Sequence, residues 1–310
     1  MIFPMKATAW NTGWLFRHLD SQENFVPVTL PHDAMQAEPR TELSANGING
    51  GWYEGRDYEY IRRFTPDKSL RSKTLMLEFE GVYHLAEVYL NGEKVAERPY
   101  GYTNFYADLT DRVRFDEENE LRVIARNSDQ PNSRWYSGAG IYRDVTLHVL
   151  PKRHIPLDGV YVTTTHELES WTMTIDTELC GVKDNGVLTH VLLDGDVPVC
   201  DVTVEAAGDH ANAVMQVLSP KLWSPDAPNV YTLQTMLGNQ VIRQNVGFRD
   251  LTFTTDRGLL VNGAPVKLHG VCLHHDLGCL GSAFHEKAMR RQLRAMRQMG
   301  VNALRTSPSP

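Results

Sequence analysis

Short alternating runs of apolar residues, separated by turn signals, fill the first half of the chain. Between Trp10 and about Leu150 they include LMLEF, AEVYL, LRVIA and DVTLHVL. Alternation with a period of two is typical of strands with one buried face, so this stretch predicts a β-sandwich. Inside it, Asn91-Gly92 in AEVYL-NG-EKVAE predicts a two-residue hairpin, because both central positions of a type I′ turn need positive φ.

A second β-rich stretch covers residues 158–251. Its candidate strands are GVYVTT, WTMTIDTEL, LTHVLLDGDVPV, ANAVMQV and VYTLQTML. Six or seven short strands over roughly a hundred residues fit an immunoglobulin-like sandwich. The segment LWSPDAPNVY predicts an irregular crossing, since Pro225 and Pro228 have no N–H to donate to a strand ladder.

The pattern changes after Asp256. VNGAP predicts another hairpin turn, VKLHGVCL a buried strand, and residues 283–299 a helix whose apolar face carries Met289, Leu293 and Met296. GVNALR then predicts a second buried strand, which gives a βαβ unit with parallel strands. We therefore predict a mainly β chain with three domains, residues 1–151, 152–252 and 253–310. The last contains one βαβ unit, which cannot close a sheet alone.

Composition and charge narrow the class of protein. Hydrophobic residues make up 42% of the 310 residues and charged residues 22%, as in folded globular proteins. A net charge of -7 argues against nucleic-acid or anionic-membrane partners, which need a dense basic surface. The basic segment KAMRRQLRAMRQ is therefore interpreted as a packed helix with solvated arginines.

The cysteines and the start of the chain bear on its location. MIFPMKATAW lacks the pattern of a signal peptide, and no apolar run is long enough to span a membrane. The four cysteines form no CxxC pair, which predicts reduced thiols and a cytoplasmic protein. A disulfide between Cys180 and Cys200, facing each other on adjacent strands, is the alternative.

Several stretches together resemble glycoside hydrolase family 2, which contains β-galactosidases, β-glucuronidases and β-mannosidases. They are VTLPHDAM, GGWYEGRDYEYIRRF, GVYHLAEVYLNG, GYTNFYADLT, SRWYSGAGIYRDVTL, LWSPDAPNVYTL, VGFRDLTF, LLVNGAPVKLHGVCLHHD and MGVNALRTS. The resemblance implies a jelly-roll sugar-binding domain, an immunoglobulin-like domain and the beginning of a (β/α)8 barrel. It also implies a fragment, because six of the eight barrel strands are missing.

Retaining glycosidases use two carboxyl groups, and in this family both are glutamates on later barrel strands. The resemblance therefore implies no catalytic residue, cofactor or metal in this chain, which should be inactive alone. Asn119-Glu120 is similar to the family's acid/base dipeptide but stands at the entrance to a jelly-roll strand, where a solvated carboxylate is poorly suited to act as an acid. The cluster His269, Cys272, His274, His275, Cys279 and His285 matches no zinc-site spacing.

The resemblance implies sugar contacts from His274, Arg305, Asp33, Trp135 and Tyr136. His274 follows the first barrel strand, where barrel active sites form, and Arg305 ends the second. A hydrogen bond from His274 to Asp276, an ion pair for Arg305, and interdomain packing for Trp135 and Tyr136 are the structural alternatives. His275 is interpreted as a supporting or exposed residue.

Two positions depart from the family pattern. Arg134 stands where galactosidases and glucuronidases often carry an Asp, and Pro308 where the family usually has a His. The predicted function is a retaining exo-β-glycosidase that forms homo-oligomers and hydrolyses terminal β-galactosides. A β-glucuronidase, or a non-catalytic carbohydrate-binding or assembly module, is the alternative.

Overall fold

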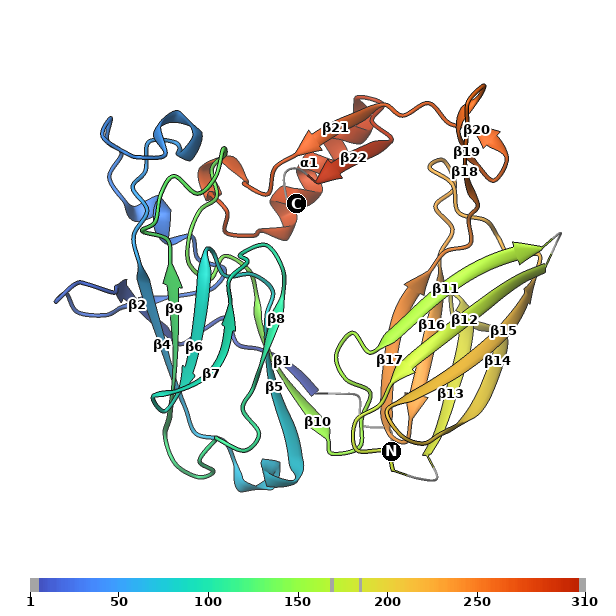
Figure 1. Cartoon of the computed structure of the whole chain (residues 1–310), viewed down its shortest axis with the longest axis horizontal. Helices are drawn as coiled ribbons and strands as arrows, with labels where there is room; N and C mark the ends of the chain where they lie inside the picture. Colours follow the sequence, from blue (N-terminus) through green and yellow to red (C-terminus); the bar gives the residue numbers. More distant parts are fainter. Residues whose placement is uncertain (1–5, 168–169, 184–185, 307–310) are drawn as a thin grey trace. The chain divides into compact units, whose positions relative to one another are not determined.

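The computed structural model describes residues 6–167, 170–183 and 186–306 (Figure 1). The predicted family difference at Pro308 lies outside these residues. The density of contacts divides the chain into two compact units. The jelly-roll unit contains Ala7–Val149 together with the chain from His269 onward, and the immunoglobulin-like unit contains Leu150–Leu268.

The jelly-roll unit is built from two sheets, with strand orders β1-β10-β5-β8 and β3-β2-β4-β9-β6-β7. The predicted runs LMLEF, AEVYL, LRVIA and DVTLHVL fall in β5, β6, β9 and β10. In chain order the strands and short 3₁₀ helices are β1 (Lys6–Ala9), β2 (Trp14–His18), β3 (Val26–Val28), η1 (Ala34–Ala37), η2 (Gly47–Gly50), β4 (Tyr58–Phe64), η3 (Lys68–Ser72), β5 (Lys73–Phe79), β6 (Leu85–Leu90), β7 (Glu93–Arg98), β8 (Phe105–Asp108), β9 (Asn119–Arg126) and β10 (Val145–Pro151).

One continuous hydrophobic core holds this unit together. Leu75, Leu77 and Phe79 of β5 and Leu121 and Val123 of β9 are almost fully buried in it. The alternate residues of these strands face outward, which is why the sequence alternates. Burial of each large side chain contributes roughly 1.5–3 kcal/mol, so the sandwich carries most of the unit's stability.

The β6–β7 hairpin turns at Asn91 and Gly92, whose φ angles are 52° and 86°. Both angles are positive, which confirms the type I′ turn. The Asn91 side chain also donates to the Asn119 Oδ1 at 2.9 Å, which ties the turn to the start of β9.

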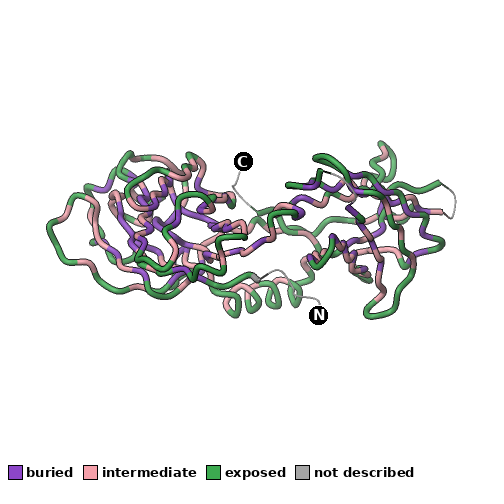
Figure 2. Tube along the Cα trace, turned by 90° about the horizontal axis from the view of Figure 1, so that it is seen from below, coloured by how far each residue is buried: buried purple, intermediate pink, exposed green. Residues whose placement is uncertain are grey.

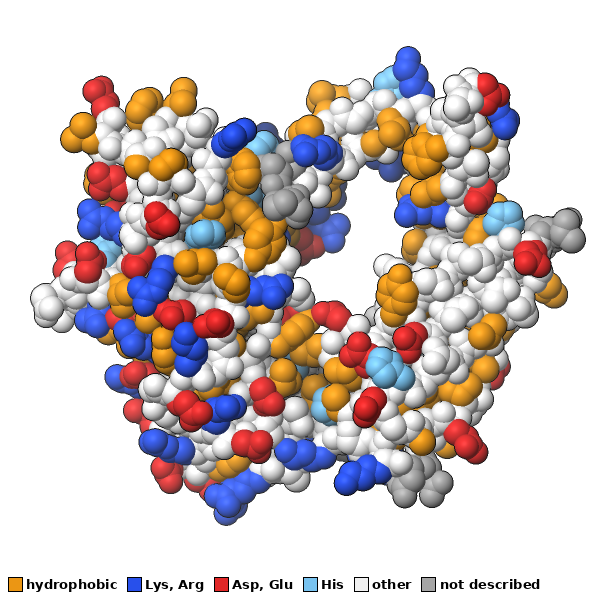
Figure 3. Space-filling model, viewed as in Figure 1, with side chains coloured by type: hydrophobic (Ala, Val, Ile, Leu, Met, Phe, Trp, Pro, Cys, Tyr) orange, Lys and Arg blue, Asp and Glu red, His pale blue; other side chains and the backbone are white. Residues whose placement is uncertain are grey.

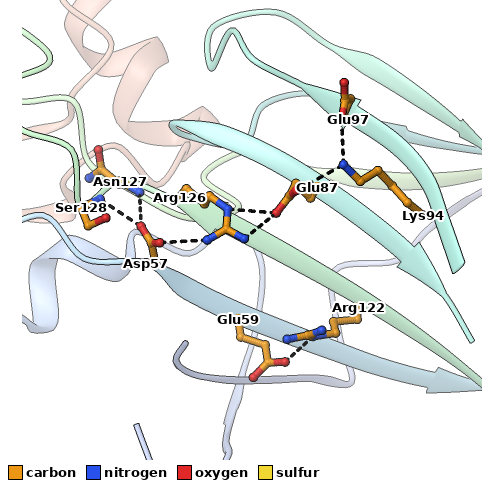
Figure 4. A network of polar contacts seen from close by, with 9 residues as sticks. All are labelled: Asp57, Glu59, Glu87, Lys94, Glu97, Arg122, Arg126, Asn127 and Ser128. Carbon is orange, nitrogen blue, oxygen red and sulfur yellow. Dashed lines mark hydrogen bonds and ion pairs between the residues drawn. The ribbon is translucent and has the colours of Figure 1, made fainter. Parts of the chain in front are cut away.

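A polar network covers the outer face of the six-stranded sheet (Figure 4). Asp57 accepts backbone hydrogen bonds from Asn127 and Ser128 at 2.9 and 3.0 Å and pairs with Arg126 at 3.2 Å. Arg126 also contacts Glu87 at 2.9 Å. Burial alone would raise the pKa of Asp57, but these hydrogen bonds outweigh it and lower the pKa. The charges on this face are therefore paired with one another.

The immunoglobulin-like unit has sheets ordered β11-β12-β15 and β14-β13-β16-β17, and a small sheet β18-β19-β20. Perfect alternation along β15 places every second side chain in the core. The predicted immunoglobulin-like sandwich is confirmed, with LTHVLLDGDVPV split by a hairpin turn. Its strands are β11 (Val160–Glu167), β12 (Ser170–Glu178), β13 (Gly186–Asp194), β14 (Val197–Ala206), β15 (His210–Leu218), β16 (Tyr231–Leu237), β17 (Gln240–Val246), β18 (Leu251–Thr254), β19 (Gly258–Val261) and β20 (Ala264–Pro265).

Two local predictions in this unit are also confirmed. Before β16 begins at its last residue, LWSPDAPNVY forms only isolated bridges, Leu222 to Phe248 and Trp223 to Pro228. Residues Asn262 and Gly263 make the turn between β19 and β20. The alternative prediction of a disulfide between Cys180 and Cys200 is wrong. In backbone pairing Cys180 lies opposite His154 and Cys200 opposite Leu192, and all four cysteines are free thiols.

The end of the described chain forms the predicted βαβ unit (Figure 1). It consists of β21 (Gly270–Leu273), η4 (Gly278–Leu280), α1 (Glu286–Gln298) and β22 (Ala303–Thr306). The two strands are parallel, with Cys272 opposite Arg305. After α1, Gly300 adopts a φ of 83°, and Val301 donates back to the Met296 carbonyl at 3.1 Å. This is a Schellman end, which only a left-handed residue allows.

The prediction that VKLHGVCL and GVNALR are buried strands is wrong. Only four residues of each are in a strand, and all of these are exposed or half-buried. The helix also has no buried residue, and Figure 2 shows no buried segment along it. In the described residues each strand has one neighbour only. Apolar periodicity therefore predicted the elements correctly, but burial needs covering layers as well.

Candidate functional site

The candidate site forms where the carboxyl end of β21 meets loops of the jelly-roll sandwich. His274 and His275 follow directly after β21, and Arg305 lies in the last half of β22. Because the strands are parallel, their carboxyl ends lie at the same edge. The structure therefore brings the predicted site residues His274 and Arg305, with His275 beside them, to one edge of the βαβ unit.

The loop after β9 supplies an indole ring to this edge. The Trp135 ring lies 6.3 Å from the His274 ring, centroid to centroid, at 58°. Its Nε1 donates to the Tyr102 hydroxyl at 2.9 Å, which fixes the ring's orientation. Trp135 remains half-buried, so part of the indole is accessible. An indole beside an imidazole offers a sugar an apolar face and a hydrogen-bonding partner.

His275 holds the segment after β21 in place through one hydrogen bond and two ring contacts. Its Nε2 lies 3.0 Å from the Ser137 carbonyl oxygen, so the ring nitrogen donates and the carbonyl accepts. The rings of Tyr102 and Tyr142 lie 5.5 and 5.7 Å away. Burial lowers the pKa of His275, which keeps the ring neutral near pH 7.

The tyrosines around this histidine are hydrogen-bond donors. Tyr142 donates to the Gly101 carbonyl at 2.8 Å, and burial raises its pKa to about 12. Burial likewise raises the pKa of Tyr102, so both phenols keep their protons. Neither residue is among the predicted site residues. Tyr102 lies in the segment GYTNFYADLT, and its place in the family motif is the signal that could have found it.

Asp33 is buried, and both oxygens of its carboxylate are used. It accepts hydrogen bonds from the backbone N–H groups of Met35, Ala139 and Ser282 at 3.1, 3.0 and 2.8 Å. The Tyr136 hydroxyl donates a fourth bond at 2.6 Å. We call these four contacts the Asp33 junction. It joins η1, the loop after β9 and the segment before α1.

Tyr136 serves the same junction. Burial, together with the neighbouring Asp33 charge, raises the pKa of the phenol, so it donates to the carboxylate. Its ring packs edge-on against Tyr53 at 5.8 Å. The geometry places Asp33 and Tyr136 as positioning residues, and their predicted contact with a sugar stays a prediction. Ser282, whose N–H completes the junction, had no sequence signal.

Arg305 is exposed, and its Nη1 lies 3.9 Å from the Cys272 sulfur on the neighbouring strand. A long exposed guanidinium can turn toward a ligand at the strand end. Arg134, at the position where the family often carries Asp, is exposed in the loop before Trp135.

Asn119-Glu120 lies at the start of β9, as predicted. The Asn119 side chain accepts from the Arg114 N–H and donates to the Arg114 and Glu117 carbonyls, so it organises a turn. Glu120 faces Arg63 at 3.2 Å on the exposed surface.

Within the described residues no group of three or more His, Cys, Asp or Glu could hold a metal ion. No helix of the described chain is long and apolar enough to cross a membrane.

Three family models match consecutive parts of the chain. The glycosyl hydrolase 2 galactose-binding domain-like model matches residues 14–142, and the model of glycosyl hydrolases family 2 matches residues 154–249. The TIM barrel domain model of the same family matches residues 253–310. The chain belongs to glycoside hydrolase family 2. The predicted fold class, a jelly roll, an immunoglobulin-like sandwich and part of a (β/α)8 barrel, is thereby confirmed.

Curated members of family 2 are similar along almost the whole chain. A β-galactosidase of Bacteroides ovatus is 33% identical, an alignment that covers 100% of this chain and 39% of the relative. A putative β-glucuronidase of Formosa agariphila is 30% identical and matches 97% of this chain and 30% of its own length. The chain thus spans 30% to 39% of the length of these two relatives.

Solved structures give the same family. A β-glycosidase from Bacteroides vulgatus is 30% identical with a TM-score of 0.91, over 98% of this chain and 42% of the other. A Bacteroides uniformis β-glucuronidase is 27% identical with a TM-score of 0.85, over 98% of this chain and 40% of the other.

Proposed function

We propose that this family 2 chain provides the jelly-roll side of the sugar site of a retaining exo-β-glycosidase that hydrolyses terminal β-galactosides. The observation that carries the proposal is the meeting of Trp135 and His274, whose rings lie 6.3 Å apart at the carboxyl end of β21. Barrel enzymes build their active sites at that end. The β-galactosidase name of the Bacteroides ovatus relative supports the choice of glycon.

The residues have separate roles in this proposal. Trp135 stacks on the apolar face of the sugar, while His274 and Arg305 hydrogen-bond its hydroxyl groups. His275, held by Ser137 and two tyrosines, fixes the backbone beside His274. Asp33 and Tyr136 hold the Trp135 loop against the segment that follows β21.

In this proposal the predicted site residues supply binding groups and no pair of catalytic carboxylates. Hydrolysis with retention needs two carboxyl groups about 5–5.5 Å apart on opposite sides of the scissile bond. Among the predicted site residues Asp33 is the one carboxylate, and its oxygens already accept four hydrogen bonds. We therefore expect the 310-residue chain to bind sugar weakly and to leave nitrophenyl β-galactoside and β-glucuronide uncleaved.

A β-glucuronidase is the second candidate, because the Formosa agariphila relative and the Bacteroides uniformis structure carry that name. Saturation-transfer NMR can measure the binding of methyl β-galactoside and of methyl β-glucuronide to the chain, and so compare its affinity for the two sugars. The stronger signal should come from the galactoside, and Trp135→Ala or His274→Ala should weaken it. Equal signals in the wild type and both variants would contradict the proposed site.

Cleavage assays with the same chain test the catalytic part. Turnover that disappears in Glu120→Gln would overturn the proposal, because it would make the exposed Asn119-Glu120 pair catalytic. Glu118→Gln, a change of a neighbouring exposed carboxylate, is the matched control.

A further inference from the structure

The loop between β3 and β4 exposes large apolar side chains far along the chain from Trp135 and His274. Trp52 is 40% exposed, Ile48 76% and Leu43 89%. In Figure 3 hydrophobic side chains gather at the end of the jelly-roll unit that carries this loop. Isolated exposed apolar residues are common, but three within residues 43–52 indicate a contact surface.

Trp52 has a backbone conformation that a bulky residue rarely adopts. Its φ is 67°, in the left-handed region where a β-carbon is unfavourable. The strain is held in place by two backbone hydrogen bonds, from Trp52 N–H to the Gly47 carbonyl and from Thr41 N–H to the Trp52 carbonyl, both 2.9 Å. Strain of this kind persists where the surrounding structure fixes it and clusters at ligand sites. The loop therefore presents the indole in a fixed place.

A hollow of about 610 Å³ opens beside this indole and is lined by Arg40, Thr41, Glu42 and Trp52. Arg40 donates to the Tyr53 hydroxyl at 3.1 Å and lies 4.8 Å above the Tyr53 ring, which uses one of its five N–H donors. The Thr41 hydroxyl accepts from Leu43 N–H at 3.2 Å and keeps its own proton to donate. The exposed Glu42 carboxylate makes no hydrogen bond or ion pair to any described residue, so it can accept from a ligand.

We propose that this hollow, which we call the Trp52 hollow, is a second sugar-binding site that takes a neutral hexopyranose. A pyranose has an apolar face of C–H groups and a rim of hydroxyls, each both donor and acceptor. The indole matches the face, and Arg40, Thr41 and Glu42 supply donors and an acceptor for the rim. Arg40 and Glu42 carry opposite charges, which balance and so favour a neutral sugar over a charged one.

The Trp52 hollow is distinct from the Trp135–His274 edge but is connected to it. Tyr53, the next residue after Trp52, packs on Tyr136 of the Asp33 junction at 5.8 Å. Binding at the hollow does not require the chain to hydrolyse anything. The proposals for the two sites can therefore be supported or contradicted independently.

Fluorine NMR of the chain labelled with 5-fluorotryptophan tests this directly, because the chain has six tryptophans and each gives its own signal. Trp52→Gly removes the ring and suits the positive φ, so the variant should stay folded and identify the Trp52 signal. Titration with methyl β-galactoside should move that signal with a Kd of about 1–10 mM, as an open site allows. Methyl β-glucuronide should bind more weakly.

Controls separate the two sites and exclude indirect effects. Leu43→Ala, on the same loop but outside the lining, should leave the Trp52 titration unchanged, and Glu42→Gln should weaken it several-fold. The Trp135 signal reports the proposed active site in the same sample. If sugar shifts only the Trp135 signal, the Trp52 hollow is contradicted and the proposed function is supported. If sugar shifts only the Trp52 signal, the Trp52 hollow is supported and the proposed function is contradicted.

Two other results would also overturn this proposal. One is a Trp52 signal that does not move at 50-fold the expected Kd, taken as roughly 0.5 M sugar at the upper limit. The other is a Trp52 signal that broadens as the protein concentration rises and does not shift when sugar is added. That result would assign the loop to contact between copies of the chain.

Discussion

Two consecutive segments of the barrel-like end differ sharply in how they are held. Residues 276–284 contain the buried Leu277 and Ser282 and reach the jelly roll through the Asp33 junction. Residues 286–306, which form α1 and β22, have no buried residue. Both belong to one family-model match. The difference shows that a segment can be anchored by one carboxylate and a few backbone groups, while its amphipathic neighbour stays uncovered in the same unit.

The hydrogen bonds of the Asp33 junction explain why residues 276–284 are held to the jelly roll. A buried carboxylate that accepts four hydrogen bonds loses little by leaving water, whereas each N–H it serves would otherwise be an unpaired buried donor. Phe284 adds a backbone bond to the Tyr142 carbonyl at 3.1 Å, and Arg143 lies 4.8 Å above the Phe284 ring. By contrast, the apolar face of α1 gains nothing without a partner surface.

The largest expected effect comes from Asp33→Asn. The amide keeps the shape but turns one acceptor oxygen into a donor that faces backbone N–H groups. We expect a loss of about 2–4 kcal/mol in the free energy of unfolding of the jelly-roll unit, measured by urea denaturation.

Asp67→Asn is the matched control for this change. Asp67 also caps a 3₁₀ helix, η3, through a bond from Ser69 N–H at 2.7 Å, but it is exposed and makes no such junction. Its substitution should move the transition only slightly. Equal effects of the two substitutions would mean that capping alone, not the Asp33 junction, explains the loss.

A smaller effect should appear in hydrogen exchange along the barrel-like end. Peptides from residues 276–284 should exchange at least about tenfold more slowly than peptides from 288–306, because an unpacked 13-residue helix opens easily. Asp33→Asn should remove this difference. Uniform protection of both segments that is lost on dilution would instead indicate that a second copy of the chain covers α1.

Much of this fold could be predicted from the sequence because its signals are local. Strand alternation, the Asn91-Gly92 turn and the spacing of Met289, Leu293 and Met296 each depend on neighbouring residues, and each is confirmed. Burial of β21 and β22 could not be predicted in this way, since it depends on layers that those residues do not specify. Periodicity states which face is apolar, not what covers it.

The candidate site divides in the same way. His274 and Trp135 could be proposed from family motifs, and the structure brings their rings together. The contact from Asp33 to Ser282 joins residues 249 positions apart through a backbone N–H, for which no side-chain type gives a signal. The Trp52 hollow has no signal in the sequence, because the positive φ of Trp52 is set by the folded loop and not by its residue type.

The smallest expected effect is a loosening of residues 274–284 in mild acid. The pKa of His275 is lowered by burial from its ordinary value of 6.5, so the open state takes up a proton more readily than the closed state. The free energy of opening should be constant above pH 6.5 and fall as the pH drops below it, until the closed-state pKa is reached. Hydrogen exchange of this segment at pH 7.5 and 5.5, corrected for intrinsic rates, measures the change. His275→Gln should abolish it, while His190→Gln should not, because His190 is buried in the immunoglobulin-like unit and keeps its surroundings when residues 274–284 open. An unchanged pH response in His275→Gln would assign the loosening to His32 or His84, whose pKa values burial also lowers.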